Sequence, residues 1–201
     1  MRDEFVKTIT ETFDQNNKTV LLLGDIGVYP FKNLFKQYTD RTYNVGILEQ
    51  TMIGMSAGLA LEGFMPIVYT IAPFITSRVH EQLKLNLGYQ KLNVNIVSIG
   101  GSYDYASLGC THQAPEDISL IKQIPNFEII VPGNSNEFNQ LFNQAYKSFN
   151  PTYYRLCEQK YENKINNINV KFGKANIIKK GNQATVVVVG NLLDKVIDAC
   201  W

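Results

Sequence analysis

The sequence predicts an α/β protein with a doubly wound, mostly parallel sheet and helices on both faces. Short apolar runs alternate with longer amphipathic stretches, which is the pattern of repeated β–α units. Some runs, such as residues 19–23, are apolar or nearly so throughout, as expected for strands buried on both faces. Residues with recognisable chemistry follow the ends of these runs, and the carboxyl edge of such a sheet forms the functional site.

The elements expected in the first 70 residues alternate regularly. The first helix carries Phe5, Ile9, Thr12 and Phe13 on one face, at helical spacing. In order, we expect a helix over residues 3–16, a strand over 19–23, a short helix after Pro30, a strand over 41–45, a helix over 49–62 and a strand over 66–70.

The alternation continues to residue 157. We expect a helix over residues 74–87, a strand over 94–99, a loop over 102–111, a helix over 115–122, a strand over 127–131, a helix over 135–149 and a strand over 152–157. Asn134 or Ser135 is expected to cap the helix over 135–149.

The chain is expected to divide near residue 158. Residues 1–158 form the first domain, and the polar, asparagine-rich stretch 159–172 is a linker by composition. Residues 173–201 are expected to be the truncated start of a C-terminal α/β domain, with strands over 173–179 and 185–190 and a helix over 191–199. Such a fragment cannot bury a core of its own.

Composition excludes several classes of function. A net charge of +1 over 201 residues gives no electrostatic reason to expect nucleic acid or an anionic membrane as partner. No run of 18 apolar residues is present, so no membrane span is predicted, and the N-terminus does not resemble a signal peptide. Cys110, Cys157 and Cys200 are widely spaced, which indicates reduced thiols and a cytoplasmic location.

The helix over residues 49–62 carries small residues on one face. Gly54, Ala57 and Gly58 are three and four positions apart, so another backbone can approach them closely. Glycines inside a helix cost about 1 kcal/mol each relative to alanine, and close packing at an interface would offset this cost. Glu49 begins the helix; taken alone, it is an acid that complements the helix dipole.

Four motifs in order give the chain a family resemblance. They are GILEQ at 46–50, Phe74 followed by Arg78, THQ at 111–113, and IPN at 124–126 followed by VPGNSNE at 131–137. Together they resemble the pyrimidine-binding module of the transketolase family of thiamine-diphosphate enzymes. The resemblance covers about residues 1–160 and continues weakly to the end.

The resemblance implies roles for individual residues. Glu49 would share a proton with N1′ of the coenzyme's aminopyrimidine, which makes the neighbouring 4′-amino group basic. Phe74 would stack on that ring, with Ile71 in place of a second aromatic residue; the alternative for Phe74 is a core position. His112 would donate to substrate oxygens, although a lone histidine is more often a surface or core residue. Asp25 resembles an interface aspartate near the coenzyme.

The resemblance also implies a second chain. The sequence GDIG at 24–27 lacks the spacing of the GDG motif that binds Mg²⁺ and the diphosphate, so no metal ligand is predicted here. We therefore expect a separate subunit to bind Mg²⁺ and the diphosphate of thiamine diphosphate, with a heterotetramer as the active assembly. This chain alone is expected to be inactive.

The candidate substrate residues depart from the family pattern. Leu108 stands where a sugar-reading aspartate is frequent, and Glu158 stands where a phosphate-binding arginine is expected after Arg155. An acid would repel a phosphate, so the substrates are expected to differ from the usual sugar phosphates. Arg78 either holds a substrate anion or pairs with Glu81 or the neighbours of Glu49.

Three functions remain open from the sequence. The first is transfer of a two-carbon ketol unit between sugars by a split transketolase. The second is the activity of a 2-oxo-acid dehydrogenase β subunit or of a deoxyxylulose-phosphate-synthase-like enzyme, against which the THQ motif counts. The third is a non-catalytic partner subunit, against which Glu49, Phe74 and His112 count.

Overall fold

A six-stranded, entirely parallel sheet forms the centre of the molecule. The computed structural model describes residues 1–158 and 168–200. The strands lie in the order β2-β1-β3-β4-β6-β5. Their bounds are β1 Thr19–Leu23, β2 Thr42–Asn44, β3 Met65–Ile71, β4 Asn95–Ile99, β5 Glu128–Ile130 and β6 Thr152–Arg155. The predicted doubly wound α/β fold is confirmed, and every expected strand up to residue 157 is present.

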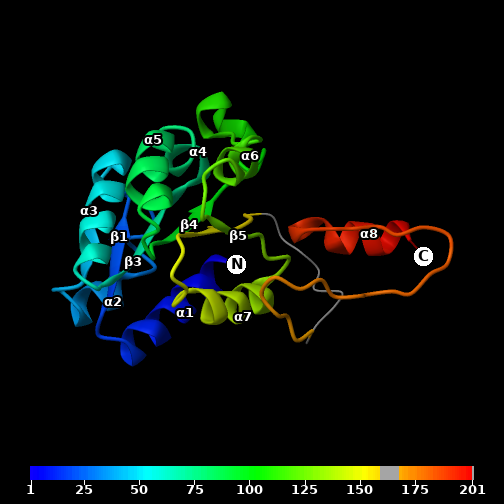
Figure 1. Cartoon of the computed structure of the whole chain (residues 1–201), viewed down its shortest axis with the longest axis horizontal. Helices are drawn as coiled ribbons and strands as arrows, with labels where there is room; N and C mark the ends of the chain where they lie inside the picture. The colour runs from blue at the N-terminus through cyan, green and yellow to red at the C-terminus, as the bar shows by residue number, and fades with distance from the viewer. Residues whose placement is uncertain (159–167, 201) are drawn as a thin grey trace.

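Helices cover both faces of the sheet, each over its own hydrophobic core (Figure 1). One face carries α1 (Arg2–Gln15), α2 (Lys32–Gln37) and α7 (Ser135–Ala145). The other carries α3 (Glu49–Leu61), α4 (Ala72–Ile75), α5 (His80–Gln82) and α6 (Asp117–Lys122). Strand β1 is buried at all its positions, as its apolar sequence predicts.

The single helix predicted over residues 74–87 is wrong. The segment divides into α4, α5 and a π-helix at Leu83–Tyr89. Gly88 lets the end of this π-helix pack closely against the segment after α6, because a Cβ at Gly88 would clash with Ile124 and lie 2.9 Å from the Pro125 carbonyl oxygen. The apolar positions Val79 and Leu83 are nevertheless fully buried, so the pattern identified the packed face and missed the breaks.

Helix α7 begins where predicted and ends earlier. Asn134 is its cap, because its side-chain oxygen accepts from the Glu137 N–H at 2.9 Å. The helix ends at Ala145 rather than at residue 149. A hydrogen-bonded turn follows, in which the Ser148 hydroxyl binds Glu128 at 3.0 Å and so ties the end of the helix to β5.

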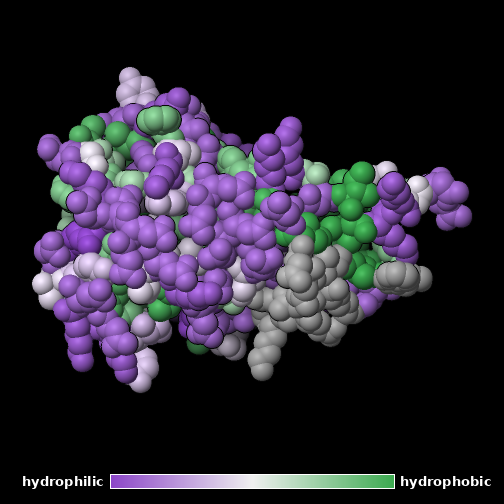
Figure 2. All heavy atoms as spheres, turned by 90° about the horizontal axis from the view of Figure 1, so that it is seen from below, coloured by the Kyte–Doolittle hydropathy of each residue, from purple (hydrophilic) through white to green (hydrophobic). Residues whose placement is uncertain are grey.

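The two strands predicted over residues 173–179 and 185–190 are wrong. Within the described part of the C-terminal segment, no residue belongs to a strand, and nearly all residues of these two stretches are exposed. Apolar side chains such as Val187, 84% exposed, remain in contact with solvent, and the described residues of this segment offer no strand beside which another could form. Figure 2 shows hydrophobic atoms gathered at the end of the molecule that carries this segment.

The end of the chain does form the predicted helix, α8 (Leu193–Ala199). Residues 168–172 lie along α7, where the Gln140 and Gln144 side chains bind the backbone of Ile168, Val170 and Phe172. Most of the linker predicted over 159–172 lies outside the described residues, so the division into domains stays a prediction. None of the helices in the described ranges has the length and apolar character to cross a membrane.

Candidate active site

The candidate site lies at the carboxyl edge of the sheet, near β1 and β3. The chain passes from β1 to β2 on one side and then returns to β3 on the other. This reversal is the topological switch point, where open α/β sheets bind their ligands. The segments that follow β2, β3 and β4 carry Glu49, Phe74 and His112 respectively.

Glu49 is buried although it begins a helix. Its side chain is 1% exposed, and its Oε2 accepts from Arg78 Nη1 at 2.7 Å. The hydroxyl of Thr70, near the end of β3, donates to the other carboxylate oxygen at 3.4 Å. The close approach of β1 to Thr70 requires Gly24, because a Cβ there would lie 2.9 Å from the Thr70 hydroxyl. The simple role of a surface acid at a helix N-terminus therefore does not describe Glu49.

Phe74 connects the buried acid to the histidine. The Arg78 guanidinium carbon lies 4.0 Å from the centre of the Phe74 ring, which is a cation–π contact. The His112 ring meets the same ring edge to face, with centroids 5.2 Å apart. The Thr111 hydroxyl is 2.9 Å from His112 Nδ1. Glu49, Arg78, Phe74 and His112 thus form one continuous set of contacts.

Ile71 and Asp25 lie at the strand ends that flank this set. Ile71 is the last residue of β3 and is half-buried. Asp25 follows β1 in a left-handed conformation, with φ of 60°. Its backbone N–H donates to Asn44 Oδ1 at 3.1 Å, and the Asn44 amide donates back to Asp25 Oδ1 at 3.0 Å. This exchange fixes the exposed turn after β1 against the end of β2.

Arg155 lies apart from the Glu49 set. It ends β6, and its Nε donates to Asp117 Oδ2 at 2.6 Å. The arginine packs closely against Gly101 in the loop after β4, because a Cβ there would meet its guanidinium group. The structure places the predicted substrate residue in an ion pair, and its substrate role stays a prediction.

Two tyrosines close to the Arg155–Asp117 pair and to Glu158 have raised pKa values. Burial, and then the Asp117 carboxylate, raises the pKa of Tyr153 well above its usual value. Burial also raises the pKa of Tyr105 to about 12. Tyr105 accepts from Arg2 Nη2 at 2.7 Å, and Arg2 Nε lies 3.3 Å from Glu158. The acid at position 158, expected to repel a phosphate, is therefore paired with a cation.

Sequence reasoning did not single out two residues that hold candidate site residues in place. Thr70 contacts Glu49, and Asp117 holds Arg155. The signal for Thr70 was a hydroxyl near the end of an otherwise apolar strand. Asp117 stands in the first turn of α6, where an acid is so common that it gives no signal.

The helix that begins at Glu49 presents an exposed apolar surface. Gly54 and Gly58 have no atom within 4 Å of the position of a Cβ. Around them, large hydrophobic side chains are exposed: Ile47, Leu48, Met55 and Leu61. Ala57, predicted on the same surface, is instead buried in the core. The small-residue surface is therefore narrower than expected and is flanked by apolar side chains.

This architecture defines an α/β domain whose carboxyl edge carries a buried acid, an aromatic ring and a histidine. Residues 1–164 match the family described as "Transketolase, pyrimidine binding domain", and the chain belongs to that family.

Its relatives include proteins of split form. It is 33% identical over 166 residues to an apulose-4-phosphate transketolase subunit of Actinobacillus succinogenes, covering 82% of this chain and 53% of that protein. It is 34% identical over 197 residues to an uncharacterized 33.6 kDa protein of the fasciation locus of Rhodococcoides fascians, covering 97% and 62%. A split-gene transketolase solved as an inactive β4 tetramer superposes with a TM-score of 0.86 at 29% identity, covering 98% and 65%.

The chain thus spans less than two thirds of the length of these relatives. Its residues fit half of a thiamine diphosphate site. A buried carboxylate that already accepts from a planar cation, next to an aromatic face, suits a protonated aminopyrimidine. Among residues 1–158 and 168–200, no group of three His, Cys, Asp or Glu side chains is placed to hold a metal ion.

Proposed function

We propose that this chain is the pyrimidine-binding subunit of a thiamine-diphosphate-dependent transketolase that moves a two-carbon ketol unit between sugars. The observation that carries the proposal is the burial of Glu49 at the switch point of the sheet, where Arg78 connects it to Phe74. An unpaired buried carboxylate is costly, and this one accepts from Arg78, a cation that also lies over the Phe74 ring. Membership of the transketolase family and the likeness to an apulose-4-phosphate transketolase subunit support it.

Each residue of the site has a task in this proposal. Bound thiamine diphosphate supplies a carbon nucleophile at C2 of its thiazolium ring. Glu49, whose side chain is 1% exposed, would hold a proton at N1′ of the pyrimidine. Phe74 orients the ring by stacking, and Ile71 lines the site beside it. His112, with Nδ1 near the Thr111 hydroxyl, presents Nε2 to a substrate oxygen.

A second subunit completes the proposal. We expect it to supply the diphosphate and Mg²⁺ ligands and to pack on the exposed surface formed by Ile47, Leu48, Met55, Leu61 and the two glycines of α3. Asp25 lies in the turn after β1, close to where such a subunit would meet the coenzyme. The solved β4 relative is described as inactive, which supports the need for another chain. A cytoplasmic location remains a prediction from cysteine usage.

The test combines this chain with its candidate large subunit. Thiamine diphosphate and Mg²⁺ are titrated by calorimetry, and ketol transfer is measured with ketose donors. We expect coenzyme binding and activity in the mixture and neither in the separate chains. Glu49→Gln should abolish activity without preventing assembly. Glu81→Gln, a matched change at an exposed acid, should leave both activity and assembly unchanged.

The other outcomes identify the alternatives. Coenzyme binding with activity on 2-oxo acids and none on ketoses would favour a dehydrogenase β subunit or a deoxyxylulose-phosphate-synthase-like enzyme. Assembly without coenzyme binding would favour a non-catalytic partner subunit.

A further inference from the structure

Arg78 contacts two of the residues that are proposed to bind the coenzyme, Glu49 and Phe74. Its Nη1 donates to Glu49 Oε2 at 2.7 Å, and its guanidinium carbon lies 4.0 Å from the centre of the Phe74 ring. A guanidinium is planar, carries positive charge and donates from its edge. One side chain therefore pairs with a buried carboxylate and also lies over an aromatic ring.

A protonated aminopyrimidine has the same three properties. It is planar and positively charged, and its ring N–H donates from the edge, so it requires the same carboxylate and the same kind of ring contact. The Glu49 side chain is 1% exposed, so a ligand reaches its oxygens only by displacing a group that covers them. We propose that Arg78 and the aminopyrimidine compete for Glu49 and Phe74, so that coenzyme binding moves Arg78 out of the site. This inference rests on the proposed function.

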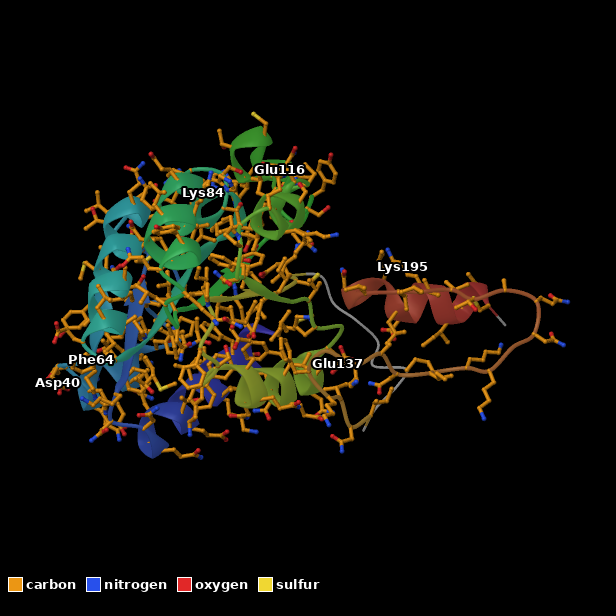
Figure 3. The ribbon with its side chains drawn as sticks, in the orientation of Figure 1. Asp40, Phe64, Lys84, Glu116, Glu137 and Lys195 are labelled. Carbon is orange, nitrogen blue, oxygen red and sulfur yellow. The ribbon has the colours of Figure 1, made fainter. Side chains whose placement is uncertain are left out.

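Arg78 is the covering group that is free to leave. Its side chain is 42% exposed, so the guanidinium can turn toward water, whereas the Glu49 side chain, 1% exposed, cannot. Thr70, the other side chain on the carboxylate, is fully buried within β3 and cannot move without disturbing the sheet. The backbone beside Arg78 is held, because the Ser77 hydroxyl donates at 2.8 Å to Glu116, the residue that precedes α6 and is labelled in Figure 3. The exchange is therefore a rotation of one side chain.

The exchange keeps the buried acid paired in both states. Removing the cation from a buried carboxylate without replacement is strongly unfavourable. Arg78 supplies the positive charge in one state, and the pyrimidinium supplies it in the other. The displaced guanidinium then lies at the rim of the site, where it can pair with an anionic group of the substrate, the role predicted for it from the sequence.

The first test measures coenzyme affinity in the complex of this chain with its large subunit. Thiamine diphosphate is titrated at saturating Mg²⁺ into wild type, Arg78→Gln, Arg78→Lys and the control Lys84→Gln. Lys84 is an exposed cation of the π-helix Leu83–Tyr89 and is labelled in Figure 3. Removing a competing state lowers the apparent Kd, so we expect Arg78→Gln to bind about threefold to tenfold more tightly. Arg78→Lys, which keeps the charge without the flat face, should fall between, and Lys84→Gln should equal wild type.

The second test uses wild type and so does not depend on how a variant folds. Phenylglyoxal, which modifies exposed guanidinium groups, is applied to the complex with and without thiamine diphosphate and Mg²⁺, and modification at Arg78 is measured by mass spectrometry. We expect the coenzyme to increase modification of Arg78 at least about twofold, since a 42% exposed side chain becomes more exposed.

The outcomes separate this inference from the proposed function. Weaker or unchanged coenzyme binding by Arg78→Gln, or protection of Arg78 from phenylglyoxal by the coenzyme, would overturn the competition and leave the proposed function standing. A wild-type complex that binds no thiamine diphosphate would overturn both.

Discussion

Two buried carboxylates near the carboxyl edge of the sheet are each paired with an arginine, and the two pairs have nearly the same bond. Glu49 accepts from Arg78 at 2.7 Å, and Asp117 accepts from Arg155 at 2.6 Å. Each acid side chain is 1% exposed. Distance and burial of the acid therefore do not distinguish the pairs.

Their surroundings do distinguish them. Asp117 also accepts from the Tyr153 hydroxyl at 3.2 Å and from the Ile118 N–H at 2.8 Å, and its arginine is 17% exposed. Glu49 has one distant hydroxyl besides an arginine that is 42% exposed. The Asp117 pair is completed within the chain, whereas the Glu49 pair has a replaceable partner and lies beside an exposed apolar surface. We infer that the first is structural and the second functional.

The largest expected effect separates the two acids by chemistry. Glu49→Gln in the assembled enzyme should slow proton exchange at C2 of thiamine diphosphate by about 10²- to 10⁴-fold, the range for loss of a positioned acid or base. Asp117→Asn, a matched acid-to-amide change, should leave the exchange rate within a few-fold of wild type. Deuterium exchange followed by NMR makes the measurement. Wild-type exchange in Glu49→Gln would remove this residue from the mechanism.

The second effect separates the same acids by stability. Asp117→Ala should lower the free energy of unfolding by about 3 kcal/mol, because it leaves Arg155 largely buried without its anion. Glu49→Ala should cost less than Asp117→Ala, since its arginine can turn into water. Urea unfolding of the isolated chain gives both values. A larger loss for Glu49→Ala would reverse the assignment of structural and functional pairs.

The third effect concerns the tyrosine that supports Asp117. Tyr153→Phe removes one donor to Asp117 and the acceptor of the Ser98 hydroxyl, which lies 2.7 Å away, and should cost about 1–2 kcal/mol. Burial raises the pKa of Tyr153, so the folded protein keeps a proton that the unfolded chain loses near pH 10. That contribution is present below about pH 10 and is lost as pH rises.

The same variant therefore predicts a change in pH dependence. Stability of wild type should fall as pH rises above about 10, and it should fall less steeply in Tyr153→Phe. Urea unfolding at several alkaline pH values makes the comparison, with Tyr89→Phe, an 81% exposed tyrosine, as control. Equal slopes in wild type and Tyr153→Phe would show that Tyr153 does not govern this loss.

The sequence predicted the sheet because strand and helix periods are local properties. The run 19–23 identified β1, and the spacing of Phe5, Ile9 and Phe13 identified α1 and its buried face. The strands predicted after residue 172 failed for a physical reason. Val186 and Val187 have strand propensity, but a strand forms only beside another strand, and propensity does not contain that information.

The site was predicted only in part, because sequence motifs are local whereas the contacts between site residues are not. Motifs indicated Glu49, Phe74 and His112. In the structure Phe74 contacts His112, and Arg78 contacts both Phe74 and Glu49. The pairing of Glu49 with Arg78 joins residues 29 positions apart, and that of Asp117 with Arg155 joins residues 38 apart. Such pairings depend on how the strands are ordered in the sheet, which single-sequence patterns do not specify.

The smallest effect tests the surface beside Glu49. Gly58 lies inside α3 with no atom within 4 Å of a Cβ position, so Gly58→Ala should stabilise the isolated chain by about 0.5–1 kcal/mol through helix propensity. If a second subunit packs on this surface, the added methyl group should weaken assembly, measured by analytical ultracentrifugation of the mixed subunits. The matched control is Gly181→Ala, also open to a Cβ but outside any helix. Stabilisation of the chain without loss of assembly would place the interface elsewhere and leave the contrast between the two acids to rest on Arg78 alone.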